Sequence, residues 1–327
     1  MPGVRDIARI AGVSPATVSR VLNGNPRVSP ELRRQVERAA AQLGYRTSRL
    51  RRPPSRSRVV ALLVPHVSSP FYAAVIGGVE GEAFANGYDL MLYTTEGRSH
   101  QDVVERVLMA DHACGLVVIT PRHGEDVALA DRSPRLPVVV VDHRNTGSRH
   151  PHVGVDNLRG AYNAVRYLLS RGYERVAMIT GPTNIQSAVD RIRGYRLALE
   201  EAGIAFDPEL VWQGDFNQPS GYDAVARWLD AGKEPPRAIF CSNDLMALGA
   251  MTALHERGIA VPERVAVMGY DDLYFAATSV PPLTTVRQPI AEMGAIAFRM
   301  VTRLARGERL DTERVLLETE LVVRGSA

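Results

Sequence analysis

Several features that would mark an exported or membrane protein are missing from this sequence. No apolar run approaches the length of a membrane span, and residues 1–7 lack the apolar stretch of a signal peptide. Only two of the 327 residues are cysteine, Cys114 and Cys241, and both lie in apolar, strand-like runs. We therefore predict a cytoplasmic protein with two reduced, buried thiols and no contact with a membrane.

The residue patterns of common enzyme sites are also absent. No Gly-rich phosphate loop follows the strand-like runs at 59–64 or 176–180, and no Gly-x-Ser-x-Gly motif occurs. The eight histidines are scattered without the spacing of a zinc site, and His150 and His152 flank Pro151 in a predicted surface loop. These absences argue against an enzyme and predict that the chain uses neither a cofactor nor a metal.

Lysine is absent from the first 58 residues, where thirteen arginines accompany only three acidic residues. This segment carries a net charge of +10, whereas the whole chain carries +3 and residues 59–327 therefore carry −7. A general solvated surface would mix charges of both signs along the chain. A small basic head on an acidic body instead predicts that the head alone binds nucleic acid.

Residues 4–23 predict two short helices joined by a tight turn at Gly12, where glycine permits a positive φ. Ser14 is placed to cap the second helix, with Pro15 at its first position. This geometry places a helix in the major groove of DNA, although an ordinary helical hairpin would show the same pattern. The residues expected to face inward are Ile7, Ala8 and Ile10 on the first helix and Val18, Val21 and Leu22 on the second.

The outward side of the second helix has short side chains and one arginine. Ala16, Thr17 and Ser19 would let the backbone approach DNA, and Arg20 could reach a phosphate or a guanine edge. Because Ala16 offers at most a methyl contact to thymine, we expect Thr17 and Arg20 to carry more of the base reading.

A third helix fits residues 29–43, with Ser29 as its cap and Gly44 at its end. Residues 1–46 would then form a three-helix DNA-binding domain. The next residues, 47–58, are polar, cationic and interrupted by Pro53 and Pro54, which is the composition of a basic linker.

From residue 59 the pattern changes to apolar strands that alternate with amphipathic helices, and this alternation restarts near residue 176. Strands rich in Val and Ile indicate parallel sheets covered on both faces, and two such runs indicate two similar lobes. A ligand of this α/β fold would bind at the carboxyl ends of the strands, in the cleft between the lobes. Strands are predicted at 59–64, 90–93, 115–119, 138–141, 176–180, 211–212, 238–241, 265–268 and 315–323, and helices at 71–86, 101–110, 157–171, 192–202, 220–231 and 244–257.

Seven short motifs carry a resemblance to a known family. Because of the order and spacing of these motifs, the chain resembles the lactose/galactose repressor (LacI/GalR) family of bacterial transcription regulators over essentially its full length. The resemblance implies a helix-turn-helix head, a two-lobed core similar to periplasmic binding proteins, and a nucleoid-associated homodimer on palindromic operator DNA. The motifs are Asp6-Ile7-Ala8, Ala11-Gly12-Val13-Ser14, Thr17-Val18-Ser19-Arg20-Val21-Leu22-Asn23, Arg191-Ile192-Arg193-Gly194-Tyr195, Ser242-Asn243-Asp244-Leu245-Met246-Ala247, Gly269-Tyr270-Asp271-Asp272 and Pro282-Leu283-Thr284-Thr285-Val286.

The resemblance also implies core boundaries and two sets of site residues. One subdomain would comprise residues 59–157 and 288–314, and the other residues 158–287 and 315–327. DNA contacts are expected from Val4, Ser14, Pro15, Ala16, Thr17, Ser19, Arg20, Asn23, Arg27, Ser29, Leu50, Arg51 and Arg52. Contacts with an effector in the cleft are expected from Phe71, Tyr72, Asp142, Arg191, Phe216, Asn243 and Asp271.

Carboxylates, an amide, a guanidinium and aromatic faces suit a polyhydroxylated ligand, so a regulator of carbohydrate uptake or catabolism, most readily a repressor, is predicted. A nucleobase effector would use similar groups, and a free solute-binding protein would explain residues 59–327 but not the basic head. Two structural alternatives stay open for these residues: Asp271 beside Asp272 could cap a helix, and Phe71 or Tyr72 could belong to the core.

The linker departs from the family pattern. In relatives a helix folds on DNA here and inserts a leucine into the minor groove. In this chain Leu50 is displaced, and Pro53 and Pro54 stand where that helix should continue. We therefore expect a weak hinge in which Arg49, Arg51 and Arg52 bind the groove electrostatically.

Overall fold

The computed structural model describes residues 4–22, 28–43, 57–96, 98, 100–110, 112–122, 136–143 and 150–327. Its N-terminal part consists of helices α1 (Val4–Ile10), α2 (Pro15–Leu22) and α3 (Pro30–Gln42). They enclose a small aliphatic core, and the Gln35 amide donates a hydrogen bond to the carbonyl of Ala11 at 3.0 Å. Ile10 is 45% exposed, which contradicts its predicted inward position, and the next residue, Ala11, is buried instead.

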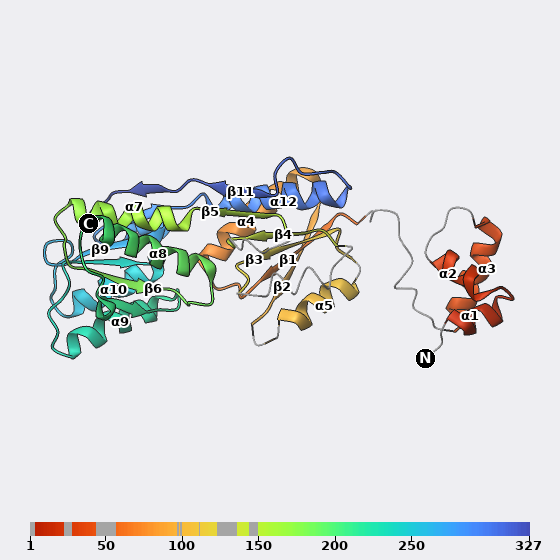
Figure 1. The fold of residues 1–327 in the computed structure, drawn as a ribbon, viewed down its shortest axis with the longest axis horizontal. Helices are drawn as coiled ribbons and strands as arrows, with labels where there is room; N and C mark the ends of the chain where they lie inside the picture. The colour runs from red at the N-terminus through yellow and green to blue at the C-terminus, as the bar shows by residue number, and fades with distance from the viewer. Residues whose placement is uncertain are drawn as a thin grey trace.

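The first lobe of the core is built around a six-stranded parallel sheet in the order β11-β5-β4-β3-β1-β2. Helices α4 and α12 pack on one face of this sheet, and α5 packs on the other (Figure 1). The elements are β1 (Val59–Val64), α4 (Pro70–Asn86), β2 (Asp89–Thr94), α5 (His100–Ala110), β3 (Gly115–Ile119), β4 (Val138–Val141), β5 (His152–Val155), α12 (Ile290–Ala305) and β11 (Arg314–Leu317).

The second lobe repeats this arrangement with the sheet order β12-β10-β9-β8-β6-β7, in which only β12 is antiparallel to its neighbour. Helices α7 and α8 cover one face, and α9, α10 and α11 cover the other. The elements are α7 (Asn157–Ser170), β6 (Val176–Thr180), α8 (Gln186–Glu201), η1 (Pro208–Leu210), β7 (Val211–Gln213), α9 (Gln218–Asp230), β8 (Ala238–Cys241), α10 (Asp244–Glu256), β9 (Ala266–Asp271), α11 (Tyr274–Thr278), β10 (Thr284–Arg287) and β12 (Glu320–Val322).

The predicted α/β class with two parallel-dominated sheets is therefore confirmed, and both cysteines are buried and free as predicted. Continuous runs of buried Val and Ile, such as β3 and β4, form the central strands because both of their faces are covered. No helix in the described ranges has the length and apolarity needed to cross a membrane.

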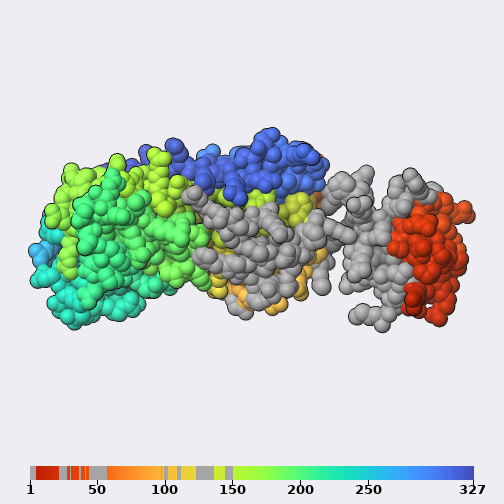
Figure 2. Space-filling view, viewed as in Figure 1, coloured from red at the N-terminus to blue at the C-terminus, as the bar shows by residue number. Residues whose placement is uncertain are grey.

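The chain passes between the lobes three times: after β5, after β10 and between β11 and β12. The predicted single strand at 315–323 is wrong, because β11 pairs with β5 of the first lobe whereas β12 pairs with β10 of the second. The third crossing thus lies at residues 318–319, later than the expected boundary after residue 314, and Asn157 opens a helix of the second lobe. In Figure 2 the blue C-terminal residues extend along one long edge, over both lobes.

The predicted surface loop at His150 and His152 is also partly wrong. His152 opens strand β5 and is buried. The residue pattern shows little sign of this strand, since a histidine and Gly154 interrupt its apolar character and the burial comes from neighbouring strands.

Candidate functional site

The predicted turn and cap of the helix-turn-helix are present. Gly12 has φ +56°, and the hydroxyl of Ser14 accepts a hydrogen bond from the backbone N–H of Thr17 at 3.1 Å. Ser29 caps α3 in the same way, accepting from the N–H of Leu32 at 3.3 Å. Both helices therefore begin with a satisfied backbone donor.

The exposed side of α2 carries the residues predicted to contact DNA. Pro15, Ala16, Ser19 and Arg20 are exposed and Thr17 is half-buried, while Val18 and Val21 point into the small core. Val4 opens α1, and Ser29 is exposed at the start of α3. Five further predicted DNA-binding residues lie outside the described residues: Asn23, Arg27, Leu50, Arg51 and Arg52.

A second candidate site lies between the two lobes, as a partly open cavity of about 40 Å³. All seven residues predicted to bind an effector line it, together with three hydroxyl-bearing residues that the sequence did not indicate. We call this space the effector cavity. Its lining consists of Ser69, Phe71, Tyr72, Thr120, Asp142, Ser187, Arg191, Phe216, Asn243 and Asp271.

Arg191 supplies the cavity's guanidinium from the second turn of α8, a helix that begins six residues earlier than predicted. Its Nε donates to Oδ1 of Asn157 at 2.9 Å, and its Nη1 donates to the carbonyl of Ser242. The guanidinium lies 3.7 Å from the centre of the Tyr270 ring. These contacts fix the plane of the group while leaving further N–H donors for a ligand.

Asp142 follows β4 and is buried. Its Oδ2 accepts hydrogen bonds from the hydroxyls of Thr120 at 3.1 Å and Ser187 at 3.2 Å. Its Oδ1 has no hydrogen-bond partner among the described residues. Burial raises the pKa of Asp142, against the opposing charge of Arg191. This oxygen is a buried acceptor that a ligand hydroxyl could satisfy.

Asp271 ends β9, with Oδ1 3.9 Å from Nη1 of Arg191. The same oxygen accepts a hydrogen bond of 2.6 Å from the amide of Gln288, which stands on the second crossing between the lobes. Burial raises the pKa of Asp271 to about 7, although Arg191 and Gln288 both act to lower it. Asp271 caps no helix, so its side chain is available to the cavity.

Phe216 covers the cavity from a turn after β7. The Asn243 side chain makes two hydrogen bonds. Its Nδ2 donates to the carbonyl of Phe216 at 2.8 Å, and its Oδ1 caps α10 by accepting from the N–H of Met246 at 2.9 Å. Asn243 thereby holds the aromatic residue in place as well as lining the cavity.

Phe71 and Tyr72 enter from the first turn of α4, with their rings edge to face at 5.8 Å. Tyr72 is buried and Phe71 half-buried. Burial raises the pKa of the Tyr72 phenol well above its ordinary value, so it stays protonated and able to donate a hydrogen bond.

Four cavity residues have positive φ without being glycine. The angles are +47° at Thr120, +57° at Asp142, +70° at Phe216 and +116° at Asp271. Such conformations are costly for residues with a Cβ and concentrate at binding sites. Here they turn side chains at the carboxyl ends of β3, β4 and β9 into the space between the lobes.

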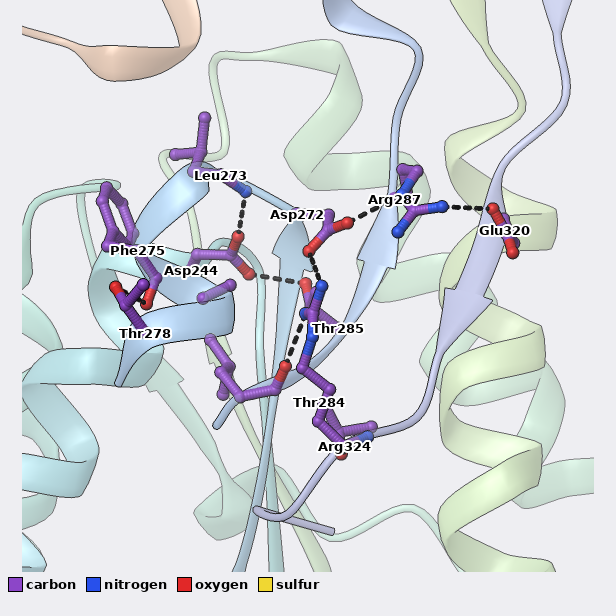
Figure 3. A network of polar contacts seen from close by, with 12 residues as sticks. Asp244, Asp272, Leu273, Phe275, Thr278, Thr284, Thr285, Arg287, Glu320 and Arg324 are labelled. Atoms are coloured by element: carbon purple, nitrogen blue, oxygen red, sulfur yellow. Dashed lines mark hydrogen bonds and ion pairs between the residues drawn. The ribbon is translucent and has the colours of Figure 1, made fainter. Parts of the chain in front are cut away.

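A polar network of the second lobe includes Asp272, the residue that follows Asp271 (Figure 3). Asp272 pairs with Arg287 and with Arg324, each at 2.7 Å, and Arg287 also pairs with Glu320 at 2.8 Å. These ion pairs tie the end of β9 to the strands that flank the second and third crossings. Asp244 accepts hydrogen bonds from the backbone N–H of Leu273 and the hydroxyl of Thr285; burial and then the neighbouring charge of Asp271 raise its pKa well above the ordinary value.

Two family models match the chain. The model described as bacterial regulatory proteins of the lacI family matches residues 4–48, and that of the periplasmic binding protein-like domain matches residues 165–327. The ribose operon repressor of Escherichia coli strain K12 is 34% identical over 333 residues, covering all of both chains. The repressor CytR of the same strain is 32% identical over 329 residues, covering 99% of this chain and 95% of the relative.

This chain belongs to the lacI family of bacterial regulatory proteins. Two solved structures of the family share its fold at a TM-score of 0.76. The regulator CelR in complex with cellobiose is 35% identical and covers 100% of both chains. The lac repressor dimer bound to operator and the anti-inducer ONPF is 26% identical, covering 99% of this chain and 98% of that one. The chain is therefore a DNA-binding transcriptional regulator whose core has the fold of ligand-binding proteins.

Proposed function

We propose that this regulator represses genes of carbohydrate uptake or catabolism, and that an uncharged sugar bound in the effector cavity is its signal. The observation that carries the proposal is the cavity lining, in which Arg191, Asp142 and Asp271 lie beside Phe71 and Phe216. Carboxylates accept hydrogen bonds from hydroxyls, a guanidinium donates to them, and aromatic rings cover the apolar faces of a sugar ring.

The charges of the cavity favour a neutral sugar over a phosphorylated one. Two carboxyl groups, Asp142 and Asp271, lie within the same buried space as the single guanidinium of Arg191. Arg191 already has Asp271 as its partner. A phosphate would lose its hydration and also face these carboxyl groups, so it would bind less well than hydroxyls.

We further propose that the head binds palindromic operator DNA as part of a homodimer. The lac repressor relative is a dimer on its operator. In this chain a groove spans both lobes and adjoins the exposed side of α4; Pro70, Ala73, Tyr274 and Ile290 line it together with the polar residues Asp271, Asp272, Gln288 and Glu292. Tyr274 is 82% exposed and Val280, just after α11, is 93% exposed. A second copy would cover this surface and bring two α2 helices to one DNA site.

A thermal-shift screen of the intact protein tests the effector. We expect D-ribose, D-glucose or cellobiose at a hundredfold excess over its Kd to stabilise the folded chain by about 2.7 kcal/mol, which is a rise in Tm of several degrees. Arg191→Met, which removes the guanidinium, should abolish the shift. A shift with purines or sugar phosphates alone, or with no compound of these classes, would overturn the sugar proposal.

Binding to a randomised library of operator duplexes tests the reading helix. Arg20→Ala should cost about 1–3 kcal/mol on the preferred site and relax the base preference at one position in each half-site. Arg38→Ala, which removes the same charge from the exposed side of α3, serves as the control and should weaken all sequences alike. An unchanged preference in the Arg20 variant would contradict the assigned role.

A further inference from the structure

The contact between Arg191 and Asn157 has no part in the proposed function so far. Nε of Arg191 donates to Oδ1 of Asn157 at 2.9 Å, and both side chains are buried. Asn157 is the first residue of α7, and it follows Asp156, the N-cap residue on the first crossing between the lobes. The acceptor for the cavity's guanidinium is thus two residues beyond the last residue of β5 in the first lobe.

This hydrogen bond decides which way the guanidinium faces. The three anchors of Arg191 come from three elements: Asn157 on α7, the carbonyl of Ser242 after β8, and the ring of Tyr270 on β9. The ring holds the plane of the group, whereas the hydrogen bonds to Nε and Nη1 set its rotation within that plane. With Nε and Nη1 so engaged, Nη2 is the nitrogen that makes no hydrogen bond to the described part of the chain.

A second, smaller space lies beside Asn157. It has a volume of about 10 Å³ and is lined from both lobes, by Gly154, Val155 and Leu316 of the first and by Gln186 and Asp190 of the second. Asp142 and Ser187 border both this space and the effector cavity. Asn157 therefore lies where side chains of both lobes meet, beside the first crossing.

We propose that Asn157 is a positioning residue that orients Arg191 toward the sugar and links the guanidinium to the first crossing. Sugar binding at Arg191 would then alter the first crossing through one buried hydrogen bond, and the relative position of the lobes would change with it. The proposal rests on the proposed function, because it requires that Arg191 binds the effector. It adds a residue that does not itself touch the sugar.

The test compares variants of the full-length protein by calorimetric titration with whichever of D-ribose, D-glucose and cellobiose gives the largest thermal shift. Asn157→Leu keeps the size of the side chain but removes the acceptor, and it should weaken sugar binding by about tenfold or more, since a buried donor is left unpaired. Asn157→Asp retains an acceptor at the same place and should restore affinity to within a few-fold. The change in operator affinity caused by the sugar should shrink in the leucine variant and recover in the aspartate variant.

Asp156→Ala is the matched control. It removes the cap of α7, in which Oδ1 of Asp156 accepts from the N–H of Arg159 at 3.1 Å, without touching Arg191. It should lower Tm while leaving the Kd for the sugar unchanged. If Asn157→Leu does not fold, Asn157→Ala takes its place, because alanine also removes the acceptor and is too small to clash with its neighbours.

The outcomes separate the two proposals. Unchanged sugar affinity and response in the folded leucine or alanine variant would overturn the role of Asn157, and so would an equal loss of affinity in Asp156→Ala. A wild-type protein that binds no sugar of the panel, or an Arg191→Met variant that binds sugar normally, would overturn the proposed function instead.

Discussion

At the scale of single residues, the effector cavity depends on how closely Phe216 approaches Gly181. A Cβ placed on Gly181 would lie 2.1 Å from Cζ of the Phe216 ring, well inside van der Waals contact. The amide of Asn243 donates a hydrogen bond to the backbone carbonyl of Phe216 and so holds the backbone that carries the ring. Only a residue without a side chain therefore lets the ring lie where it covers the cavity.

We predict that Gly181→Ala displaces the Phe216 ring and weakens sugar binding by about tenfold, through lost apolar contact. The end of an aromatic side chain can move, so the fold should survive with a small change in Tm. Calorimetric titration and thermal unfolding measure the two effects. Gly154→Ala is the control, because a Cβ there meets nothing within 4 Å. Equal sugar affinity in the two variants would contradict the prediction.

The raised pKa of Asp271 predicts a pH dependence of sugar binding. Only the ionised carboxylate accepts hydrogen bonds from hydroxyls with both oxygens, and with a pKa of about 7 the ionised fraction rises across neutrality. Sugar affinity should therefore increase about tenfold from pH 6 to pH 8, with proton release on binding below pH 7. Titrations in buffers of different ionisation enthalpy measure both. Asp271→Asn should abolish the pH dependence, and a flat profile in the wild type would contradict the assignment.

The same shift fixes the sign of a stability effect. The carboxyl group of Asp271 has its pKa raised in the folded chain above the ordinary value of 3.8. Its contribution to stability is therefore present at acidic pH and is lost as the pH rises toward 7, because the unfolded chain releases the proton first. Burial also raises the pKa of Asp244. The ionisation of both carboxyl groups therefore lowers the free energy of unfolding as the pH rises toward neutrality.

The residues that the sequence predicted and those that it missed differ in physical kind. Arg191, Asn243 and Asp271 lie in motifs, so resemblance to a family identified them. Thr120 and Ser187 are single hydroxyl residues without a motif, and they matter because both donate to Asp142. That convergence depends on the relative position of two lobes, which no local pattern in the sequence contains.

At the scale of elements, the recognition helix α2 illustrates what local sequence signals can predict. Its turn glycine, its cap and its buried valines were all predicted and are confirmed. A helix of eight residues is marginal in isolation, so it depends on these local contacts. The head has only a small aliphatic core to stabilise it further.

We predict that Ser14→Ala destabilises the head by about 1 kcal/mol, because the N–H of Thr17 loses its acceptor. Ser14→Asp keeps an acceptor and adds a negative charge at the positive end of the helix, so the stability should be retained. Its operator affinity should nevertheless fall, since the charge faces DNA phosphate. Thermal unfolding and DNA titration separate the effects. A stable alanine variant would show that the cap is dispensable.

Local sequence patterns did not predict strand β10 or the start of helix α8 correctly, and the structure shows why. Strand β10 contains Thr284 and Thr285, which are buried although polar, because the hydroxyl of Thr284 accepts from the backbone N–H of Arg324 and the hydroxyl of Thr285 donates to Asp244. Helix α8 was predicted to start late because its first turns are polar residues that face the cavity and its surroundings. Sequence patterns therefore located the strands and helices with apolar character, including β3 and β4 of the site, and failed where polar residues are buried or face the cavity.

At the scale of the whole molecule, the two-lobed organisation followed from the restart of the strand-helix pattern, but the way the chain joins the lobes did not. Strand β11 pairs with β5 from far away in the sequence, and a short connection later the chain reaches the other sheet. Two of the three crossings are joined to residues that line the effector cavity: Asn157 at the first accepts a hydrogen bond from Arg191, and Gln288 at the second donates one to Asp271. A ligand at Arg191 and Asp271 would therefore be coupled to both of these crossings.

The positive charge of the chain is concentrated in its N-terminal head. A head of net charge +10 on a body of −7 allows the DNA phosphates to attract one end only. Two such heads are needed to read a palindrome with useful affinity, because the second binds at the high effective concentration created by the first. If the proposed dimer forms through Tyr274 and Val280, this surface would limit DNA binding as much as α2 does.

We predict that Val280→Asp converts the dimer to a monomer at micromolar concentration, because a charge is placed within an apolar contact and would have to lose its hydration. Affinity for a palindromic operator should fall by about a hundredfold or more, whereas binding of a single half-site and of sugar should not change. Leu197→Asp is the matched control: this leucine is also exposed, but on α8, across the sheet from α11. Analytical ultracentrifugation and operator titration of both variants measure the outcome. A Val280 variant that stays dimeric and binds operator normally would place the contact between copies elsewhere on the molecule.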